Sequence, residues 1–496
     1  MSRVGRVEPV RKVVTSQTRS ASAAAPQLKA GALGLREATV TGLSNMAPAM
    51  SLFFSVNVLA GTIGASIPFI FILAMLGILA TANTLCQFTR LYPSAGSFVT
   101  FITRAFNPYV GAIGGTFLIG GYIMAAGSVY AVIGGWTADV LHRDLGITLP
   151  WQVLMIVGMV ILAALLVVGV EISTRAALVL FLFETAILLL LGIVIVIRQA
   201  GHLSATPFAP PSTSGGLGGL ATAFALTIFA FVGWEASAPL AEETSNPRRN
   251  VPIAVITGVV ILAAIYVFVT YAVVIGFGVE HITALASDQT AFSTLASTYL
   301  GPLRGLIDIA GVTSILAGTL ALSNTQGRIF FHGGRARIFP SILGRVNPRY
   351  QTPAIAIVVY MALGTIMVFV AQVLLGVASL PNDAFSIFGD LATFGTLPLI
   401  LIYGLTNIAL IVYTARGGAP GANPLTHYVL PAVGALLLLA PVWSFTQTAP
   451  PPFDRVVPVA FVLLVVSIIY GLAMARRNPA AAEQVGSALG SGDVSR

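Results

Sequence analysis

The chain has 496 residues, of which 56% are hydrophobic and 8% are charged, and its formal net charge at pH 7 is +8. Ordinary soluble domains carry about 25% charged residues, so the composition excludes a soluble globular protein. Stretches such as 153–170 and 253–275 are apolar on every face, whereas strands of a membrane β-barrel alternate polar and apolar residues. We therefore expect an all-α membrane protein.

About twelve stretches are long and apolar enough to cross a membrane as helices. In chain order they cover residues 38–63, 66–89, 107–138, 151–170, 176–197, 217–240, 252–277, 304–327, 353–376, 385–413, 428–446 and 456–475. Residues 1–36 are polar, basic and rich in alanine, so we expect a disordered tail there and no signal peptide. Residues 476–496 form the predicted C-terminal tail.

The distribution of basic residues predicts the orientation in the membrane. An even number of spans places both termini on one side, and Lys and Arg accumulate in cytoplasmic loops. With both termini in the cytoplasm, 21 of the 25 Lys and Arg residues lie on the cytoplasmic side and four on the other. The positive charge therefore indicates topology and contact with anionic membrane lipids, rather than nucleic-acid binding.

Two segments interrupt the helical pattern inside predicted spans. Residues 42–49 in span 1 read GLSNMAPA, and residues 229–235 in span 6 read FAFVGWE and are followed by Pro239. Paired interruptions five spans apart predict two repeats of five spans in opposite orientation, since the number of spans in each repeat is odd. An ordinary proline kink in each span is the alternative. The expected units are residues 37–198 (spans 1–5), 217–413 (spans 6–10) and 428–475 (spans 11 and 12).

Helix breaks of this kind expose backbone groups that can bind a zwitterion. The half-helix that begins at a break leaves free N–H groups, and the half-helix that ends there leaves free C=O groups, each with a partial charge. An α-amino acid needs donors for its carboxylate and acceptors for its ammonium group. Two breaks that meet at mid-membrane supply both.

Four acidic residues lie within predicted spans: Glu184, Glu235, Asp308 and Asp390. Ionisable residues inside a membrane are costly, which makes them functional candidates. Glu235 directly follows the second break, where a carboxyl that is alternately hydrated and desolvated can bind and release a proton. A structural tie to a neighbouring helix is the alternative. For Glu184 we favour a structural role over coupling, and either a hydrated gate or an interfacial side chain explains the other two acids.

Motifs that follow spans 2, 6 and 8 carry a family resemblance. Span 2 is followed by YPSAG at 92–96, span 6 leads into AEETSNPRRNVP at 241–252, and the loop after span 8 contains Phe339-Pro340 and Thr352-Pro353 after Arg328 and Arg335. In this order and spacing, over about residues 38–475, they resemble the amino acid, polyamine and organocation (APC) transporter superfamily. The usual Gly-x-Gly at the first break is replaced here by residues 47–49, and the usual Arg-Asp-Gly by residues 335–337.

The resemblance implies a leucine-transporter-like fold, with broken helices 1 and 6 in a five-plus-five inverted repeat and two further C-terminal helices. It also implies a substrate site at the two breaks, completed by spans 3 and 8. The residues expected there are Ser44, Asn45, Met46, Ala47, Pro48, Tyr122, Phe229, Ala230, Phe231, Val232, Gly233, Trp234, Ser323 and Asn324. Phe229, Phe231 and Trp234 are candidates for a lid over the substrate, with aromatic packing between helices as the alternative. For Tyr122, Ser323 and Asn324 the alternative is hydrogen bonding between helices.

In transporters that this chain resembles, an acid at the position of Glu235 is implicated in proton coupling. Sodium is the alternative coupling ion, since the hydroxyls of Thr319 and Ser323 could help to ligate it. A cytoplasmic gate is expected at the end of span 6, with a solvated loop as the alternative. Its residues are Glu242, Glu243, Arg248 and Arg249.

Motifs of several enzyme classes are absent from the sequence. Lys12 and Lys29 are the only lysines and neither precedes Ser or Thr, so there is no P-loop, and no H-E-x-x-H or G-x-S-x-G occurs. We expect a secondary active transporter, not an enzyme, that imports an amino acid across the plasma membrane by alternating access, with proton coupling and no cofactor. The alternatives are a polyamine or organic-amine transporter or exchanger, and a channel or substrate-sensing receptor on the same scaffold.

Overall fold

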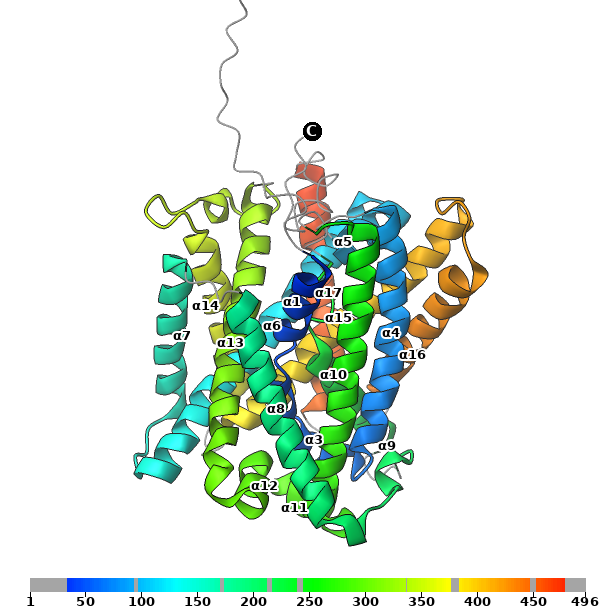
Figure 1. The fold of residues 1–496 in the computed structure, drawn as a ribbon. Helices are drawn as coiled ribbons and strands as arrows, with labels where there is room; N and C mark the ends of the chain where they lie inside the picture. Colours follow the sequence, from blue (N-terminus) through cyan, green and yellow to red (C-terminus); the bar gives the residue numbers. More distant parts are fainter. Residues whose placement is uncertain are drawn as a thin grey trace, which may run out of the picture.

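The computed structural model describes residues 34–92, 97–169, 174–211, 216–238, 244–335, 337–375, 383–446 and 452–477. Within these ranges the chain forms a bundle of α-helices joined by short turns and contains no strand (Figure 1). The prediction of an all-α membrane protein is confirmed. The predicted terminal tails lie outside the described residues, apart from the last residues of the first tail and the first residues of the second.

Helices occupy the positions of all predicted spans. In the first half of the chain they are α1 (Leu35–Asn45), α2 (Pro48–Phe53) and α3 (Val56–Ile63) for span 1, followed by α4 (Ile67–Leu91), α6 (Pro108–Leu145), α7 (Trp151–Val168) and α8 (Thr174–Arg198). In the second half they are α9 (Gly216–Phe231), α10 (Pro247–Phe277), α13 (Gly305–Arg335), α14 (Ala354–Leu375), α15 (Asp383–Ala415), α16 (Leu430–Ser444) and α17 (Val456–Arg477). Three shorter helices were not predicted: α5 (Ser97–Ala105), α11 (Ile282–Ser287) and α12 (Ala291–Tyr299).

The described helices account for most of the expected membrane crossings. Nine of them are long and apolar enough to cross a membrane, or ten if α1 to α3, which bend by 61° between Phe53 and Val56, form one span. Two shorter apolar helices, Gly219–Phe231 and Leu425–Leu439, lie where spans 6 and 11 are predicted. The count of twelve and the inverted repeat therefore stay predictions.

Helix α6 packs closely against α15 because glycines face one another at their contact. A Cβ atom on Gly121 would lie 2.8 Å from the carbonyl oxygen of Gly395, and one on Gly395 would lie equally close to the carbonyl oxygen of Gly121. A side chain at either position would push the two backbones apart. The close contact fixes Tyr122, the next residue on α6, inside the bundle, where it is buried.

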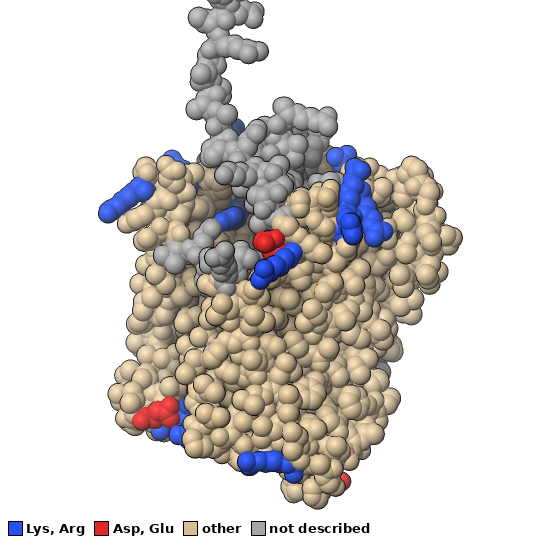
Figure 2. Space-filling view, in the orientation of Figure 1, with Lys and Arg blue, Asp and Glu red and all other residues tan. Residues whose placement is uncertain are grey.

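Exposed charged side chains on one face of the molecule lie near the two ends of the bundle. Figure 2 shows blue and red residues at the upper and lower ends of this face and an uncharged band between them, as expected for a multi-pass membrane protein. At the end opposite the start of α1 and the end of α17, Arg143 Nη2 lies 2.9 Å from Asp308 Oδ2 and Arg143 Nη1 lies 3.6 Å from Asp139 Oδ2. The hydroxyl of Ser293 donates to Asp308 Oδ1 at 2.9 Å. These contacts join α6, α12 and α13.

Candidate functional site

The first predicted break is present between α1 and α2. Helix α1 ends at Asn45, and Ala47 has φ 41° and ψ 68°, in the left-handed region that alanine rarely occupies. Pro48 then begins α2, where its fixed φ suits a first helical residue. Helix α13 approaches this break closely because Gly318 has no side chain: a Cβ there would lie 3.1 Å from the Cβ of Ala47.

The second predicted break follows α9. The helix ends at Phe231 and the chain continues in tight turns as far as Ser237, with φ 104° at Gly233. A Cβ on Gly233 would lie only 2.9 Å from the carbonyl oxygen of Asn45. The hydroxyl of Ser237 also donates to the carbonyl oxygen of Ala38 in α1 at 2.8 Å, which is a second contact between the two segments. The two breaks, almost 190 positions apart in the sequence, are therefore in direct contact.

Glu235 lies at the meeting point of these segments and is buried, with 8% of its surface exposed. The hydroxyl of Tyr122 on α6 donates to its Oε1 at 2.6 Å, and the N–H of Gly233 lies 3.3 Å from its Oε2. Tyr403 on α15 is a further neighbour of this carboxyl. Among the described residues this carboxyl has no basic partner and one short hydrogen bond, from a neutral phenol, and such a carboxyl can exist in both the charged and the neutral form.

The three predicted lid aromatics pack against other rings of the bundle. The ring centroids of Phe229 and Phe388 are 5.6 Å apart, and the ring of Phe231 lies 5.2 Å from that of Tyr266. Trp234 lies 5.6 Å from Tyr403, edge to face. These contacts fit the alternative of packing between helices, and whether any of the three also closes over a substrate stays a prediction.

Other residues expected at the two breaks fall into two groups. Met46, Ala47 and Pro48 are buried at the first break, as is Ala230 at the second, where its carbonyl oxygen accepts from the hydroxyl of Tyr266 at 2.8 Å. Ser44 and Val232 lie beside them and are partly buried.

Ser323 and Asn324, which are neighbours on α13, point in different directions. Ser323 is buried and shares a hydrogen bond of 2.8 Å with the hydroxyl of Tyr130 on α6. Asn324 instead lines a separate cavity of about 240 Å³ with Arg328 and with Thr352, which lies just before α14. The structure therefore does not bring Asn324 to the contact between the breaks.

The residues of the predicted gate are only partly described. Glu242 and Glu243 lie outside the described residues. Arg248 and Arg249 are exposed in the first turn of α10. The gate therefore stays a prediction.

Glu184 on α8 makes contacts that the sequence did not indicate. Its side chain is 3% exposed, and its Oε2 accepts from the N–H of Ala49 at the start of α2, at 3.2 Å. The next N–H, of Met50, donates to the hydroxyl of Ser314 on α13 at 3.0 Å. Glu184 therefore satisfies the beginning of a half-helix, a position that neither periodicity nor spacing predicts.

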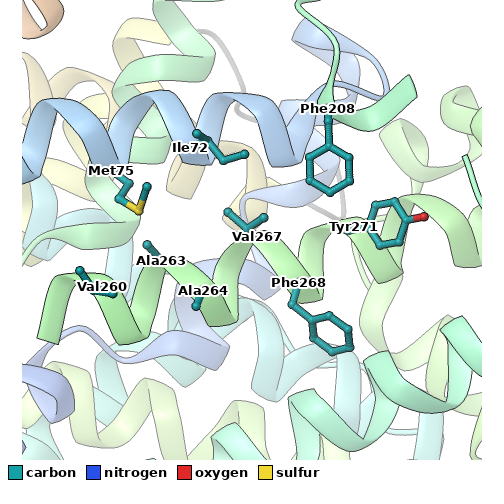
Figure 3. Close-up of a pocket in the computed structure, with 9 residues that line it drawn as sticks. All are labelled: Ile72, Met75, Phe208, Val260, Ala263, Ala264, Val267, Phe268 and Tyr271. Carbon is teal, nitrogen blue, oxygen red and sulfur yellow. The ribbon is translucent and has the colours of Figure 1, made fainter. Parts of the chain in front are cut away.

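A larger cavity lies away from this site, between α4 and α10 (Figure 3). It has a volume of about 440 Å³, and its wall is almost entirely apolar. The residues that line it are Ile72, Met75, Phe208, Val260, Ala263, Ala264, Val267, Phe268 and Tyr271. The rings of Phe208 and Tyr271 stack 5.2 Å apart at one end. None of the described residues that line this cavity is acidic or basic, so they do not offer the charged groups that would orient a polar substrate.

Comparisons with known proteins find similarity over most of the chain. The sequence profile of a family described as "Amino acid permease" matches residues 33–471. The branched-chain amino acid permease BcaP of Bacillus subtilis (strain 168) is 28% identical over 346 residues, which cover 65% of this chain and 71% of the relative. The low-affinity putrescine importer PlaP of Escherichia coli (strain K12) is 24% identical over 344 residues, covering 68% and 74%. The b(0,+)-type amino acid transporter 1 of Homo sapiens is 27% identical over 232 residues, covering 46% and 44%.

Proposed function

Since the chain belongs to the amino acid permease family, and is therefore a membrane transporter and not an enzyme, we propose that it imports an amino acid or a related amine by alternating access, driven by protons. The observation that carries the proposal is the contact between Gly233 and Asn45, where two helix breaks meet inside the bundle. Interrupted helices bring backbone dipoles to a buried point without charged side chains. The names of the relatives, a branched-chain amino acid permease and a putrescine importer, support this range of substrates.

Proton coupling is proposed to use Glu235. Its carboxyl is buried beside the second break and hydrogen-bonded to Tyr122 on another helix, so movement of either segment changes its surroundings. Desolvation favours the neutral form of a carboxyl and hydration favours the charged form. Sodium stays the alternative coupling ion. The hydroxyl of Thr319 donates to the carbonyl oxygen of Ile315 at 2.7 Å, and Ser323 shares a hydrogen bond with Tyr130. A hydroxyl oxygen that donates its proton can still coordinate a cation with its lone pairs.

Uptake into vesicles reconstituted with the purified protein tests this function. A panel of labelled amino acids and amines is offered with either a proton or a sodium gradient imposed alone. We expect saturable accumulation of at least one amino acid or amine with an inward proton gradient. Flux that does not saturate would instead indicate a channel, and binding without accumulation would indicate a receptor.

We further propose that the protein lies in the plasma membrane with both termini in the cytoplasm. The start of α1 and the end of α17 lie at the same end of the bundle (Figure 1), and the distribution of Lys and Arg assigns that end to the cytoplasm.

Cysteine labelling on intact cells tests this orientation. The single native cysteine, Cys86, is buried and gives little background. An impermeant thiol reagent is expected to label Leu145→Cys, at the exposed end of α6, and to leave Ser495→Cys unlabelled until the cells are opened. Labelling of the variant at position 495 on intact cells contradicts the proposed topology.

A further inference from the structure

The first N–H groups within α2 already have acceptors. A helix begins with backbone N–H groups that lack partners within the helix, but Pro48 has no N–H at all. The N–H of Ala49 donates to Glu184 Oε2 at 3.2 Å, that of Met50 to Ser314 Oγ at 3.0 Å and that of Ser51 to the carbonyl oxygen of Ala47 at 3.0 Å. The protein's own carboxylate therefore accepts from a backbone N–H to which a substrate carboxylate could otherwise bind.

Two backbone N–H groups at the second break also have acceptors. The N–H of Gly233 donates to Glu235, and that of Trp234 to the carbonyl oxygen of Phe231 at 3.0 Å. The hydroxyl of Ser44 and the indole N–H of Trp234 have no hydrogen-bond partner among the described residues. A hydroxyl can donate as well as accept, but two neutral donors do not offset the cost of burying a carboxylate.

The charges inside the bundle have one sign. Glu184, Glu235 and Asp390 are buried, and no Lys, Arg or His is buried in the part of the chain that the structure describes. Bringing another carboxylate into this interior adds like charge and leaves it without a basic partner, which is strongly unfavourable. An ammonium group brings the opposite charge, and the buried carboxyl groups can accept its hydrogen bonds.

We propose that Glu184 determines specificity by occupying the carboxylate position at the start of α2, so that the transported substrates are organic amines without an α-carboxylate. The inference rests on the proposed transport function and narrows its substrate class. Glu184 excludes amino acids by steric and electrostatic competition for the N–H of Ala49, while the buried acidic side chains attract the ammonium group of an amine.

Matched pairs of solutes that differ only in the carboxylate test the substrate class in vesicles containing the wild-type protein. The pairs are cadaverine with lysine, putrescine with ornithine, and agmatine with arginine. For the transported pair, we expect half-maximal uptake at an amine concentration about tenfold or more below that of the parent amino acid. Preferential uptake of the amino acids overturns the inference but leaves the proposed transport function intact. Failure of both members of every pair, and of all other amino acids and amines, overturns both.

Two variants test the role of Glu184 itself. Glu184→Ala frees the N–H of Ala49, and we expect the preference for the amine to fall at least about fivefold because the amino acid gains a donor. Glu184→Gln keeps an acceptor for that N–H but removes the charge, so an intermediate preference is expected. A purely structural role would lower uptake of both solutes in parallel. An unchanged ratio in folded protein of both variants therefore overturns the role of Glu184, and if neither variant folds, the wild-type ratio still decides the substrate class.

Discussion

Replacement of Glu235 by Gln is expected to abolish accumulation driven by protons while exchange of substrate continues. A gradient of one pH unit corresponds to about 1.4 kcal/mol, enough for roughly tenfold accumulation if one proton accompanies each substrate. In the variant the ratio of internal to external substrate should approach one, because the amide cannot bind and release a proton. Its side-chain oxygen can still accept the hydrogen bond of 2.6 Å from Tyr122, so the site keeps its shape.

Vesicles with a clamped membrane potential, loaded with labelled substrate for exchange or empty for uptake, measure both activities. The residual exchange should no longer depend on pH, since the titrating group is gone. Asp308→Asn is the matched control, an acid-to-amide change in the Arg143 cluster at the end of the bundle, and it should accumulate substrate as the wild type does. Full accumulation by Glu235→Gln rules out the coupling role and makes sodium the leading candidate. Parallel loss of folded yield, exchange and uptake would identify Glu235 as a structural residue.

Substitution of Gly233 by Leu is expected to eliminate uptake and leave the protein folded in the membrane. Its Cβ would lie 2.9 Å from the carbonyl oxygen of Asn45, so the two breaks would be forced apart at their contact. Overpacking of this kind costs about 1–3 kcal/mol, and a non-glycine residue at φ 104° adds about 1–3 kcal/mol of backbone strain. Transport is measured in vesicles, and folding by thermal stability and size-exclusion chromatography in detergent.

Gly64→Leu is the control that separates the effect of backbone strain from the effect of a steric clash. Gly64 also has a positive φ, of 63°, but a Cβ there would meet no atom within 4 Å. We therefore expect this control to lose some thermal stability and to keep its uptake. Normal uptake by Gly233→Leu would show that the substrate pathway does not involve the contact between the breaks.

The positions of both breaks could be predicted from the sequence because local chemistry determines them. Pro48 lacks the N–H that would continue a helix and follows a polar stretch, whereas Pro252 and Pro398 lie inside α10 and α15 without ending them. Gly233 permits a backbone conformation that other residues avoid. The apolar spans were predicted for the same reason, since each depends on residues close together in the chain. Helices α5 and α12 were missed because nine-residue segments carry too little periodicity to be distinguished from loops.

Contacts between distant spans could not be predicted in this way. Tyr122 and Glu235 are 113 positions apart, and Glu184 and Ala49 are 135 apart, so each pair depends on how complete helices pack. The direction in which a side chain points around its helix could not be predicted either, because it too depends on how complete helices pack. Ser323 and Asn324 were equally plausible from the sequence, but adjacent residues on a helix point about 100° apart, and packing directs only Ser323 toward α6.

The left-handed conformation of Ala47 influences which states of the protein are populated. An alanine in this region is about 1–2 kcal/mol less stable than in a right-handed conformation. An alternative arrangement of α1 and α2 in which residue 47 has a negative φ does not carry this cost, and is therefore stabilised by the same amount relative to the present one. A gain of 1.4 kcal/mol changes a ratio of populations about tenfold. The methyl group of one residue, where Gly318 of α13 approaches it, therefore lowers the free-energy cost of moving the first half-helix before substrate or proton contributes any binding energy.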